Sequence, residues 1–408
     1  MIPNALPQSL VDNPLLGQWI AFEPDRRVAL KTGKVEIGQG ILTALRQIAA
    51  EELDVEPARL RVVSGDTALS PNEGVTAGSL SVEISGAAIR LVCAEVRARM
   101  LEGAAMWLGV DAAALGVSDG QILRAGEATG LDYWSIANAV DLSVAATGSV
   151  PTKLPSSYRI VGRSEPRLDL PAKVFGAPFV HDLKLPGMVH ARVLHRPWTG
   201  ARLTSSDEAL GKVAGPGVEI VRDGDFVAFL SSDETEAAAA LGRAWERLSW
   251  EGGAPLDAEH QEAAWLATQP TKDRQIGPDN APSPAAEFRV NARYSRPYLA
   301  HGSIGPSCAV ARIADGLLEV WTHTQGVEPL KNSLARVLHV PLDALILHHQ
   351  QGAGCYGHNG ADDVALDAAL LALRRPGTPV RVLWMREDEL SSSPFGAAML
   401  VELEAGCD

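Results

Sequence analysis

The chain has 408 residues, of which 46% are hydrophobic and 21% charged, as in ordinary globular proteins, and this length allows two or three domains. Its 36 basic and 50 acidic residues give a formal net charge of −14. This balance argues against binding to nucleic acid or to an anionic membrane surface, because both need clustered positive charge.

The N-terminal segment and the cysteines indicate the compartment in which the protein works. The first positive residue is Arg26, and no apolar run reaches the roughly 18 residues of a membrane helix. The four cysteines, Cys93, Cys308, Cys355 and Cys407, have no C-x-x-C spacing, so they predict no zinc or iron–sulfur site and favour a reducing compartment. We expect a soluble, cytoplasmic protein without metal ligands of its own.

The first predicted unit covers residues 1–150. Residues 27–38 alternate like a pair of strands, and Ile41, Leu45, Ile48 and Leu53 then follow helical spacing. Residues 60–67 predict a strand that runs into the polar loop 68–86. The following segment predicts a helix with Ala88, Leu91, Val92 and Val96 on its apolar face and Arg90, Glu95, Arg97 and Arg99 toward water. Residues 116–157 look irregular.

The remaining chain divides into three further segments. Residues 151–252 predict a domain of short strands, with strands at 187–194 and 226–232 and a helix followed by a strand within 233–250. Residues 253–287 are rich in proline and asparagine and predict a linker or wrapping loop. Residues 288–408 form a last unit that we expect to be incomplete at its C-terminus, where Met399, Val401 and Leu403 alternate like a half-buried strand.

One pattern occurs twice. Leu45, Leu53, Val55, Leu60 and Val62 recur at a constant offset of 285 residues as Leu330, Leu338, Val340, Leu345 and Leu347. Each copy reads helix–turn–strand and follows a glutamine in a turn, Gln39 or Gln325. The repeat predicts two related lobes that face one another, with a ligand between their loops. The adjacent His348 and His349 in the second copy should point to opposite faces of a strand and pack there.

A glycine-rich stretch, Gly352-x-Gly354-x-x-Gly357, matches the dinucleotide-binding fingerprint literally. We disfavour a bound nucleotide, because the next helix should begin only after Asn359-Gly360. Its first turn also carries Asp362 and Asp363, which would repel a phosphate. The glycines of this loop, and those of Gly38-Gln39-Gly40, instead predict backbone N–H groups that approach some other polar ligand.

Seven segments in the same order resemble a known family. They are "GKVEIGQGILTALRQIAAEELDV", "GDTALSPNEGVTAGSLS", "YRIVGRSEPRLDLPAKVFG", "DLKLPGMVHARVLHRP", "YLAHGSIGP", "THTQ" and "GAGCYGHNGADD" with the segment after it. Together they resemble the molybdopterin-binding subunit of the xanthine dehydrogenase/aldehyde oxidase family, nearest to its nicotinate dehydrogenase and isoquinoline 1-oxidoreductase branch. The resemblance implies an α+β fold in which two related molybdopterin-binding α/β lobes flank a hammerhead domain, the latter at 151–252.

The resemblance also implies a cofactor and its site. The cofactor would be molybdopterin with molybdenum, in bacteria commonly the cytosine dinucleotide form, held without protein metal ligands. Residues carried over as cofactor-binding are Gly38, Gln39, Gly40, Thr76, Ala77, Gly78, Ser79, Ser81, Gln325, Gly354, Tyr356 and Gly357. Gln325 would lie beside the metal's oxo group, to which the N–H groups of Tyr356 and Gly357 would donate, so these three are the candidate catalytic residues. His301 and His358 lie near the same loops.

The implied reaction hydroxylates an N-heteroaromatic, nicotinate-like substrate with oxygen from water. The family's catalytic glutamate lies in a Gly-x-Gly-Glu context that is absent here, so we expect it on a second molybdopterin-binding chain. An iron–sulfur small subunit, and an FAD or haem on a flavin or cytochrome subunit, would remove the electrons. The rival hypotheses are an aldehyde or purine dehydrogenase, a non-catalytic scaffold and an NAD-binding dehydrogenase. Gly305 before Pro306 departs from relatives with a glutamate nearby, which weakens the purine reading.

Overall fold

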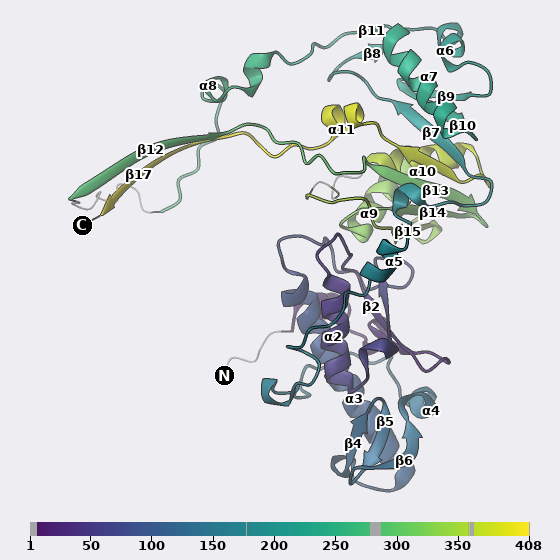
Figure 1. Cartoon of the computed structure of the whole chain (residues 1–408), viewed down its shortest axis with the longest axis vertical. Coiled ribbons are helices and arrows are strands. Elements are labelled where there is room, and N and C mark those ends of the chain that lie inside the picture. Colours follow the sequence, from purple (N-terminus) through teal and green to yellow (C-terminus); the bar gives the residue numbers. More distant parts are fainter. Residues whose placement is uncertain (1–5, 177, 278–286, 358, 360–362, 408) are drawn as a thin grey trace. The chain divides into compact units, whose positions relative to one another are not determined.

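The computed structural model describes residues 6–176, 178–277, 287–357, 359 and 363–407. The chain forms two compact units, each assembled from separate stretches of sequence (Figure 1). The first comprises Met1–Ala191 and Ile304–Leu383, and the second Arg192–Ser303 and Trp384–Asp408. Helices and strands are mixed in both units, which confirms the expected α+β class.

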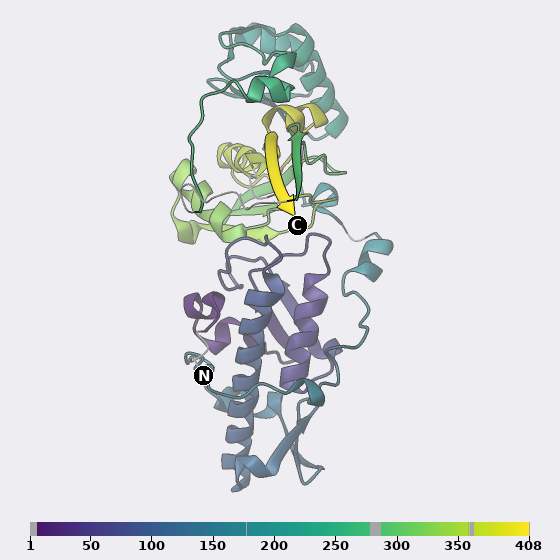
Figure 2. The same cartoon turned by 90° about the vertical axis from the view of Figure 1, so that its left-hand side faces the viewer.

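The first unit begins with a small sheet covered by two helices. Its elements are α1 (Gln8–Asp12), β1 (Ile20–Phe22), β2 (Val28–Thr32), α2 (Ile41–Leu53), β3 (Leu60–Ser64), a π-helical turn at Ser81–Gly86 and α3 (Ala87–Leu108). β2 lies between an antiparallel β1 and a parallel β3. α2 and α3 run side by side (Figure 2) and bury Leu45, Ile89 and Val92 completely. The two predicted helices are confirmed.

Three sequence expectations for this region are wrong. The strand pair at 27–38 is a single strand, β2, because the buried carboxylate of Glu36 holds residues 33–40 in a loop. Glu95 does not face water: it is buried, and its carboxylate accepts the backbone N–H of Thr147 at 2.8 Å. Residues 116–157 are not irregular throughout. They contain the antiparallel sheet β4 (Leu115–Ser118), β5 (Gln121–Arg124) and β6 (Glu127–Asp132), then α4 (Tyr133–Ile136).

The connecting segment at residues 159–161 is held against α2 by the buried carboxylate of Glu51, a residue of that helix. Glu51 accepts the backbone N–H groups of Arg159, Ile160 and Val161 at 2.9, 2.6 and 3.0 Å. Burial alone would raise the pKa of the Glu51 carboxyl, but these N–H groups and Lys153 outweigh it, so that its pKa lies below the usual value. The carboxylate therefore stabilises the fold in its charged form.

Replacing Glu51 by alanine is expected to lower the free energy of unfolding by about 3 kcal/mol at pH 7, because three partly buried N–H groups lose a charged acceptor. Since the folded pKa is depressed, this stabilisation is present above the unfolded pKa near 4.5 and is lost as the pH falls below it. Urea titrations at pH 7 and pH 4 test the prediction, with the exposed Glu56→Ala as control. An equal loss in both variants would contradict it.

The rest of the first unit is a sheet covered by helices. It includes α5 (Leu170–Val174) and β7 (Val189–Leu194), of which β7 begins in this unit. The later elements are β13 (Cys308–Ala314), β14 (Leu317–Thr322), α9 (Val327–Leu338), β15 (Leu345–His349), α10 (Asp363–Arg374) and β16 (Val380–Leu383). The strand order in this unit is β15-β14-β13-β16-β7. β15 runs parallel to β14, and β13 runs antiparallel to both of its neighbours.

The structure confirms the internal repeat. α2 and α9 each end on a residue in the left-handed conformation, Asp54 and His339 respectively. A short 3-10 turn then leads in both copies to a strand, β3 or β15, which pairs in parallel with the strand before the helix. The copies differ in the loop that precedes the helix, which spans residues 33–40 in the first and only 323–326 in the second.

The second unit contains the short-stranded domain and a separate ribbon. Its elements are β8 (Arg202–Leu203), α6 (Asp207–Ala214), β9 (Glu219–Asp223), β10 (Phe226–Ser231), α7 (Glu234–Arg247), β11 (Trp250–Glu251), α8 (Ala263–Leu266), β12 (Phe288–Arg296), α11 (Arg386–Ser392) and β17 (Met399–Cys407). The strands and helix predicted within 187–250 are confirmed. β12 and β17 pair with each other as an antiparallel ribbon, so β17 is exposed, not half-buried as expected. No helix in the described ranges is both long and apolar enough to span a membrane.

Candidate functional site

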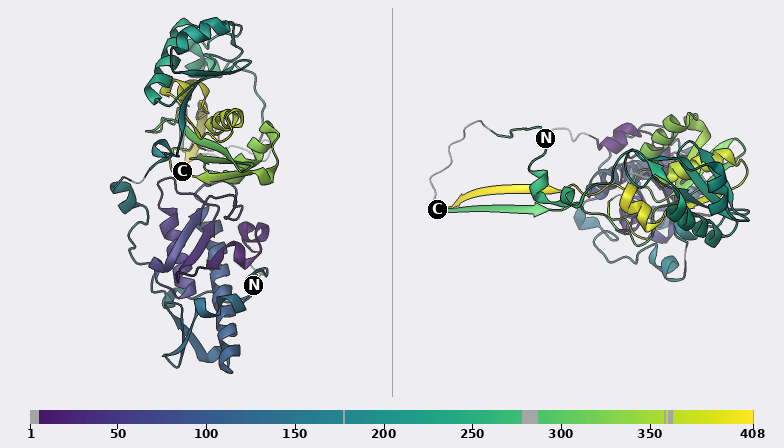
Figure 3. Two further views of the ribbon diagram at one scale, coloured as in Figure 1. Left: turned by 90° about the vertical axis from the view of Figure 1, so that its right-hand side faces the viewer. Right: turned by 90° about the horizontal axis from the view of Figure 1, so that it is seen from above.

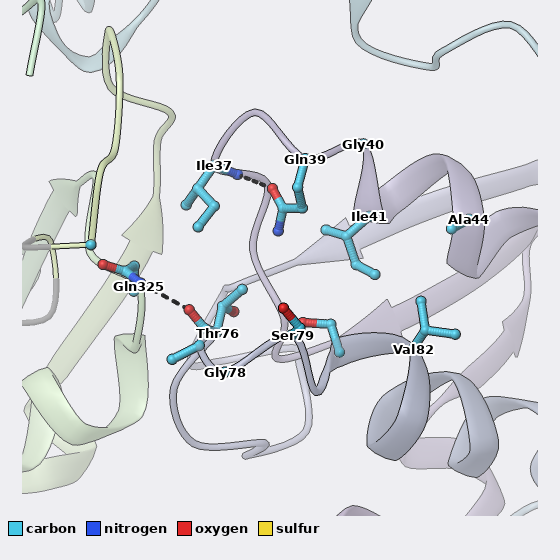
Figure 4. A pocket seen from close by; sticks show the side chains of 13 residues that line it. Ile37, Gln39, Gly40, Ile41, Ala44, Thr76, Gly78, Ser79, Val82 and Gln325 are labelled. Carbon is cyan, nitrogen blue, oxygen red and sulfur yellow. Dashed lines mark hydrogen bonds between the residues drawn. The ribbon is translucent and has the colours of Figure 1, made fainter. Parts of the chain in front are cut away.

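A cavity of about 540 Å³ in the first unit brings together loops from both copies of the repeat (Figure 4). It lies between the turn before α2, the loop that ends in the π-helical turn, and the turn before α9. The lining residues that the sequence had singled out are Gln39, Gly40, Thr76, Ala77, Gly78, Ser79, Ser81, Gln325 and Gly357. Segments about 285 residues apart thus form a single concave surface.

The Gly38-Gln39-Gly40 turn is held by its own neighbours. The Glu36 carboxylate accepts the N–H groups of Gly38 and Gly40 at 2.9 and 2.8 Å, and both glycines have positive φ. The Gln39 side chain accepts the N–H of Ile37 at 2.7 Å and donates to the Val35 carbonyl at 3.0 Å. The expectation that the N–H groups of both glycines point at a ligand is therefore wrong, because Glu36 already occupies them.

A basic side chain supports the same turn from outside the cavity lining. Arg167 donates to the Gly38 carbonyl at 2.9 Å and lies 3.5 Å from the Glu36 carboxylate. Its guanidinium also makes two hydrogen bonds to Asp169 at 3.0 and 2.7 Å. The guanidinium beside Asp169, together with Lys173, lowers the pKa of that carboxyl to about 2. The turn is thus fixed before any ligand arrives, which reduces the conformational entropy that binding must remove.

The glutamine of the second copy joins the two halves of the cavity. The backbone carbonyl of Gln325 accepts the backbone N–H of Thr76 at 2.7 Å. The side-chain amide of Gln325 donates to the Thr76 carbonyl at 2.9 Å. The Thr76 hydroxyl in turn accepts the N–H of Val35 at 3.0 Å. Next to it, Gly78 and Ser79 both adopt positive φ, which turns the chain sharply toward the π-helical turn.

One polar atom of this arrangement lacks a partner. Gln325 is only 6% exposed, and its side-chain oxygen Oε1 has no hydrogen bond within the described part of the chain. A buried carbonyl oxygen without a donor costs about 1–3 kcal/mol, so such atoms are rare in folded proteins. This oxygen belongs to a residue that lines the cavity, and a ligand with an N–H or O–H donor would satisfy it.

Two helix starts also open on the cavity. α2 begins at Ile41, and the π-helical turn that continues into α3 begins at Ser81, and both residues line the cavity. The N-cap residue supplies no side-chain cap at either start, but at α2 the Glu36 carboxylate accepts the Leu42 N–H at 3.5 Å and puts negative charge beside that start. The N-terminal ends of helices carry partial positive charge and free N–H groups, so they favour an anionic group. Because Glu36 offsets this charge at α2, only the start at Ser81 favours an anionic group, and with the unpartnered Gln325 oxygen the cavity suits a ligand that combines donors with negative charge.

The structure separates the remaining candidate residues from the cavity lining. Gly38, Gly354 and Tyr356 do not line it. Tyr356 is 54% exposed. Gly354 has positive φ, and a side chain there would meet the Ile304 N–H and the Tyr356 hydroxyl at 3.3 Å. His301 hydrogen-bonds the Pro394 carbonyl in the second unit, and His358 lies outside the described residues.

Four apolar lining residues were not predicted as site residues: Ile37, Ile41, Ala44 and Val82. Ile41 and Ala44 are three residues apart on α2, so they lie on the same helix face. That spacing, together with the position of Gln39 just before the helix, was the signal that could have revealed them. Their side chains give the cavity an apolar part beside its polar groups, a combination typical of sites for small organic ligands.

A half-buried histidine connects the two loops that carry the glutamines. His349 lies 3.0 Å from the Thr324 carbonyl through Nδ1 and 3.0 Å from the Glu36 carbonyl through Nε2. Burial lowers the pKa of its imidazole to about 4, although both carbonyls act in the opposite direction. Its neighbour His348 points the other way, stacks on Trp321 and hydrogen-bonds Asp66 at 3.0 Å. The opposite orientations are as predicted, and His349 additionally bridges the two loops.

Comparison with known proteins agrees with this geometry. Residues 7–172 and residues 268–408 each match a molybdopterin cofactor-binding domain, and the cavity is lined from both. The chain is 34% identical over 407 residues to a nicotinate dehydrogenase subunit of Pseudomonas putida, covering 96% of this chain and 34% of that protein. It is 26% identical over 442 residues to the beta subunit of isoquinoline 1-oxidoreductase of Brevundimonas diminuta, covering 95% of this chain and 56% of that protein.

The comparisons also limit which properties of these relatives apply to this chain. The chain spans about a third to about half of the length of these relatives. The crystal structure of the aldehyde oxidoreductase from Desulfovibrio desulfuricans aligns with a TM-score of 0.51 at 15% identity, over 68% of this chain and 36% of that one. That likeness concerns the fold alone. On its two matched domains and its relatives, the chain belongs to the molybdopterin-binding proteins of the xanthine dehydrogenase family.

Proposed function

We propose that this chain is the molybdopterin-binding part of a heteromeric molybdenum hydroxylase that acts on an N-heteroaromatic, nicotinate-like substrate. One observation carries the proposal: a single cavity unites the loops of both copies of the repeat, in a chain whose two matched domains bind molybdopterin in their family. The names of the relatives, nicotinate dehydrogenase and isoquinoline 1-oxidoreductase, support the substrate class.

The residues present fit such a cofactor. The unpartnered oxygen of Gln325 would accept a hydrogen bond from an amino or ring N–H group of the pterin. The helix start at Ser81 would favour a phosphate, and the Ser79 and Ser81 hydroxyls could donate to it. Ile37 and Ala44 would cover the apolar side of the ligand. When bound, molybdopterin with its metal would supply the two-electron oxidation and the oxygen transfer, while this chain supplies binding and orientation.

The form of the cofactor and the identity of the partner chains are further parts of the proposal. A cytosine dinucleotide form would carry a second phosphate, and the partial positive charge of the helix start at Ser81 would favour such a group. The catalytic glutamate, iron–sulfur clusters and an FAD or haem would come from partner chains, including a second molybdopterin-binding chain. An aldehyde oxidoreductase is the main alternative, because the chain is also 25% identical over 282 residues to the molybdenum-binding chain of an Escherichia coli aldehyde oxidoreductase.

The proposal is tested by purifying the tagged chain from its source and measuring molybdenum, released cytosine nucleotide and associated polypeptides. We expect close to one molybdenum per chain, an iron–sulfur protein and oxidation of nicotinate in preference to aldehydes. A chain without molybdenum would overturn the cofactor assignment. A molybdenum-loaded complex that oxidises aldehydes and not N-heteroaromatics would support the cofactor assignment and overturn the substrate assignment.

Filling the cavity should remove the cofactor without disturbing the fold. Ala44→Phe places a ring at the cavity wall on α2, where no hydrogen bond is lost, so we expect at least a tenfold drop in bound molybdenum with an unchanged circular dichroism spectrum. The matched control is Ala239→Phe, on the exposed face of α7, which should retain full occupancy. Equal molybdenum content in both variants would place the cofactor elsewhere.

A further inference from the structure

The ribbon of β12 and β17 has an apolar face that is exposed along its whole length. Its register places Phe288 opposite Cys407, Val290 opposite Ala405, Ala292 opposite Leu403, Tyr294 opposite Val401 and Arg296 opposite Met399. Because side chains alternate along a strand, all of these pairs share one face. Its large apolar members, Phe288, Val290, Tyr294, Met399, Val401 and Leu403, are between 39% and 63% exposed.

The opposite face of the ribbon carries charged side chains that pair across the strands. Arg289 pairs with Glu404 at 2.7 Å and Arg293 with Glu402 at 3.3 Å, across the two strands. These charged pairs alternate with the apolar pairs, so the ribbon is amphipathic, and the two views in Figures 1 and 3 show its strands lying side by side. Among the described strands they pair only with each other. A two-stranded ribbon is at best marginally stable alone, and exposed apolar surfaces of this kind mark interaction sites.

We propose that this apolar face, called here the ribbon face and defined by Phe288, Val290, Tyr294, Met399, Val401 and Leu403, docks the second molybdopterin-binding chain. The proposal rests on the proposed function, which requires that chain. The ribbon face fits an uncharged partner surface of β-branched and aromatic side chains, most simply one face of a sheet, because strands of a twisted ribbon pack well against another sheet.

Two observations favour this occupant over a second copy of the same chain. A chain with a net charge of −14 repels its own copies at long range, whereas the ribbon itself carries balanced charge pairs and repels nothing specifically. In addition, about two thirds of the Pseudomonas putida nicotinate dehydrogenase polypeptide lies outside the matched part, since only 34% of that protein is covered. That relative therefore has a large polypeptide region that this chain does not match, and in the proposed function the second molybdopterin-binding chain carries such a region.

The test compares two doubly substituted chains that add the same charge to opposite faces of β12. Val290→Lys with Tyr294→Lys changes the ribbon face, and Asn291→Lys with Ser295→Lys changes the polar face; all four positions are exposed, so both variants should fold. The probe is the polypeptide of the same source that carries the rest of the molybdenum-binding protein. We expect its affinity to fall at least a hundredfold for the ribbon-face variant and less than threefold for the control.

Hydrogen exchange provides a second readout. Amides of 288–296 and 399–407 should become protected when the wild-type chain binds the probe. Equal affinities of both variants, or unchanged exchange in the complex, would overturn the proposal. A wild-type dimer that only the ribbon-face variant abolishes would also overturn it and make a second copy the occupant. Molybdenum measured in the same complex separates the two proposals: a ribbon-dependent complex without molybdenum refutes the proposed function alone, and a molybdenum-loaded complex insensitive to the ribbon refutes the docking surface alone.

Discussion

Replacing Gly65 by alanine is expected to lower the free energy of unfolding of the first unit by about 2–5 kcal/mol. Gly65 has φ +61°, a left-handed conformation that costs other residues about 1–2 kcal/mol. A Cβ atom there would lie 2.6 Å from Val35 Cγ1 and 2.7 Å from the Cβ of His349, inside any normal contact distance. Relieving such overpacking typically costs a further 1–3 kcal/mol or so.

The location of Gly65 makes this loss matter for the site. Its carbonyl accepts the backbone N–H of His349 at 2.8 Å, and two residues later Thr67 exchanges hydrogen bonds with Leu347. These contacts join the end of β3 to β15, so they hold the two copies of the repeat together. Pushing Gly65 away from His349 should therefore also displace the loops that carry Gln39 and Gln325.

Thermal and urea unfolding of Gly65→Ala test the prediction against Gly116→Ala. Gly116 lies on β4 in the same unit, its added Cβ would meet nothing within 4 Å, and its φ is ordinary. We expect the control to change stability by less than about 1 kcal/mol. If Gly65→Ala were as stable as the control, the close approach of β3 and β15 would not be a constraint on the fold.

The internal repeat shows how far the sequence alone could reach. Helical spacing at 41–53 and 330–338 and the strands after them come from local apolar patterns, and the structure confirms them as α2, β3, α9 and β15. Local patterns could not reveal that residues 33–40 form a loop, because the alternation there looks like a strand. Only the buried Glu36, which accepts two glycine N–H groups, decides the outcome, and its burial depends on the tertiary structure.

The candidate site could likewise be predicted only in part from the sequence. Resemblance identified Gln39, the Thr76–Ser81 loop and Gln325, and the structure places them around a single cavity. Their roles toward a cofactor stay a prediction. The apolar wall escaped notice because Ile41 and Ala44 look like ordinary helix residues, and only their position just after Gln39 indicated that this helix face meets the cavity. The exposure of β17 escaped notice because alternation predicts an apolar face but not whether anything covers it.

Replacing His349 by glutamine is expected to remove a pH dependence of stability between pH 4 and 6.5. The neutral imidazole has one N–H, so it donates to only one of the two carbonyls that flank it, those of Thr324 and Glu36. Protonation would supply the second donor, but burial opposes the charge more strongly and lowers the pKa to about 4. The unfolded chain, with an ordinary pKa near 6.5, therefore binds a proton in this range that the folded chain does not.

The sign follows from this difference in bound protons. Above pH 6.5 both states are neutral at this residue and the fold carries no penalty from it. As the pH falls from 6.5 toward 4, protonation stabilises the unfolded chain, and folding loses up to about 3 kcal/mol. At pH 5 the wild type should have lost about 2 kcal/mol through this residue, whereas His349→Gln loses nothing through it.

Urea titrations of both proteins at pH 7.5 and pH 5 measure the effect, with His260→Gln, on a surface 3-10 turn of the second unit, as control. At pH 7.5 the His349 variant should be less stable by about 1–3 kcal/mol, because a buried carbonyl loses its donor. At pH 5 most of that difference should disappear, while the control follows the wild type at both values. A difference that stays constant with pH would mean that His349 titrates alike in both states, and that its position between the two loops rests on packing alone.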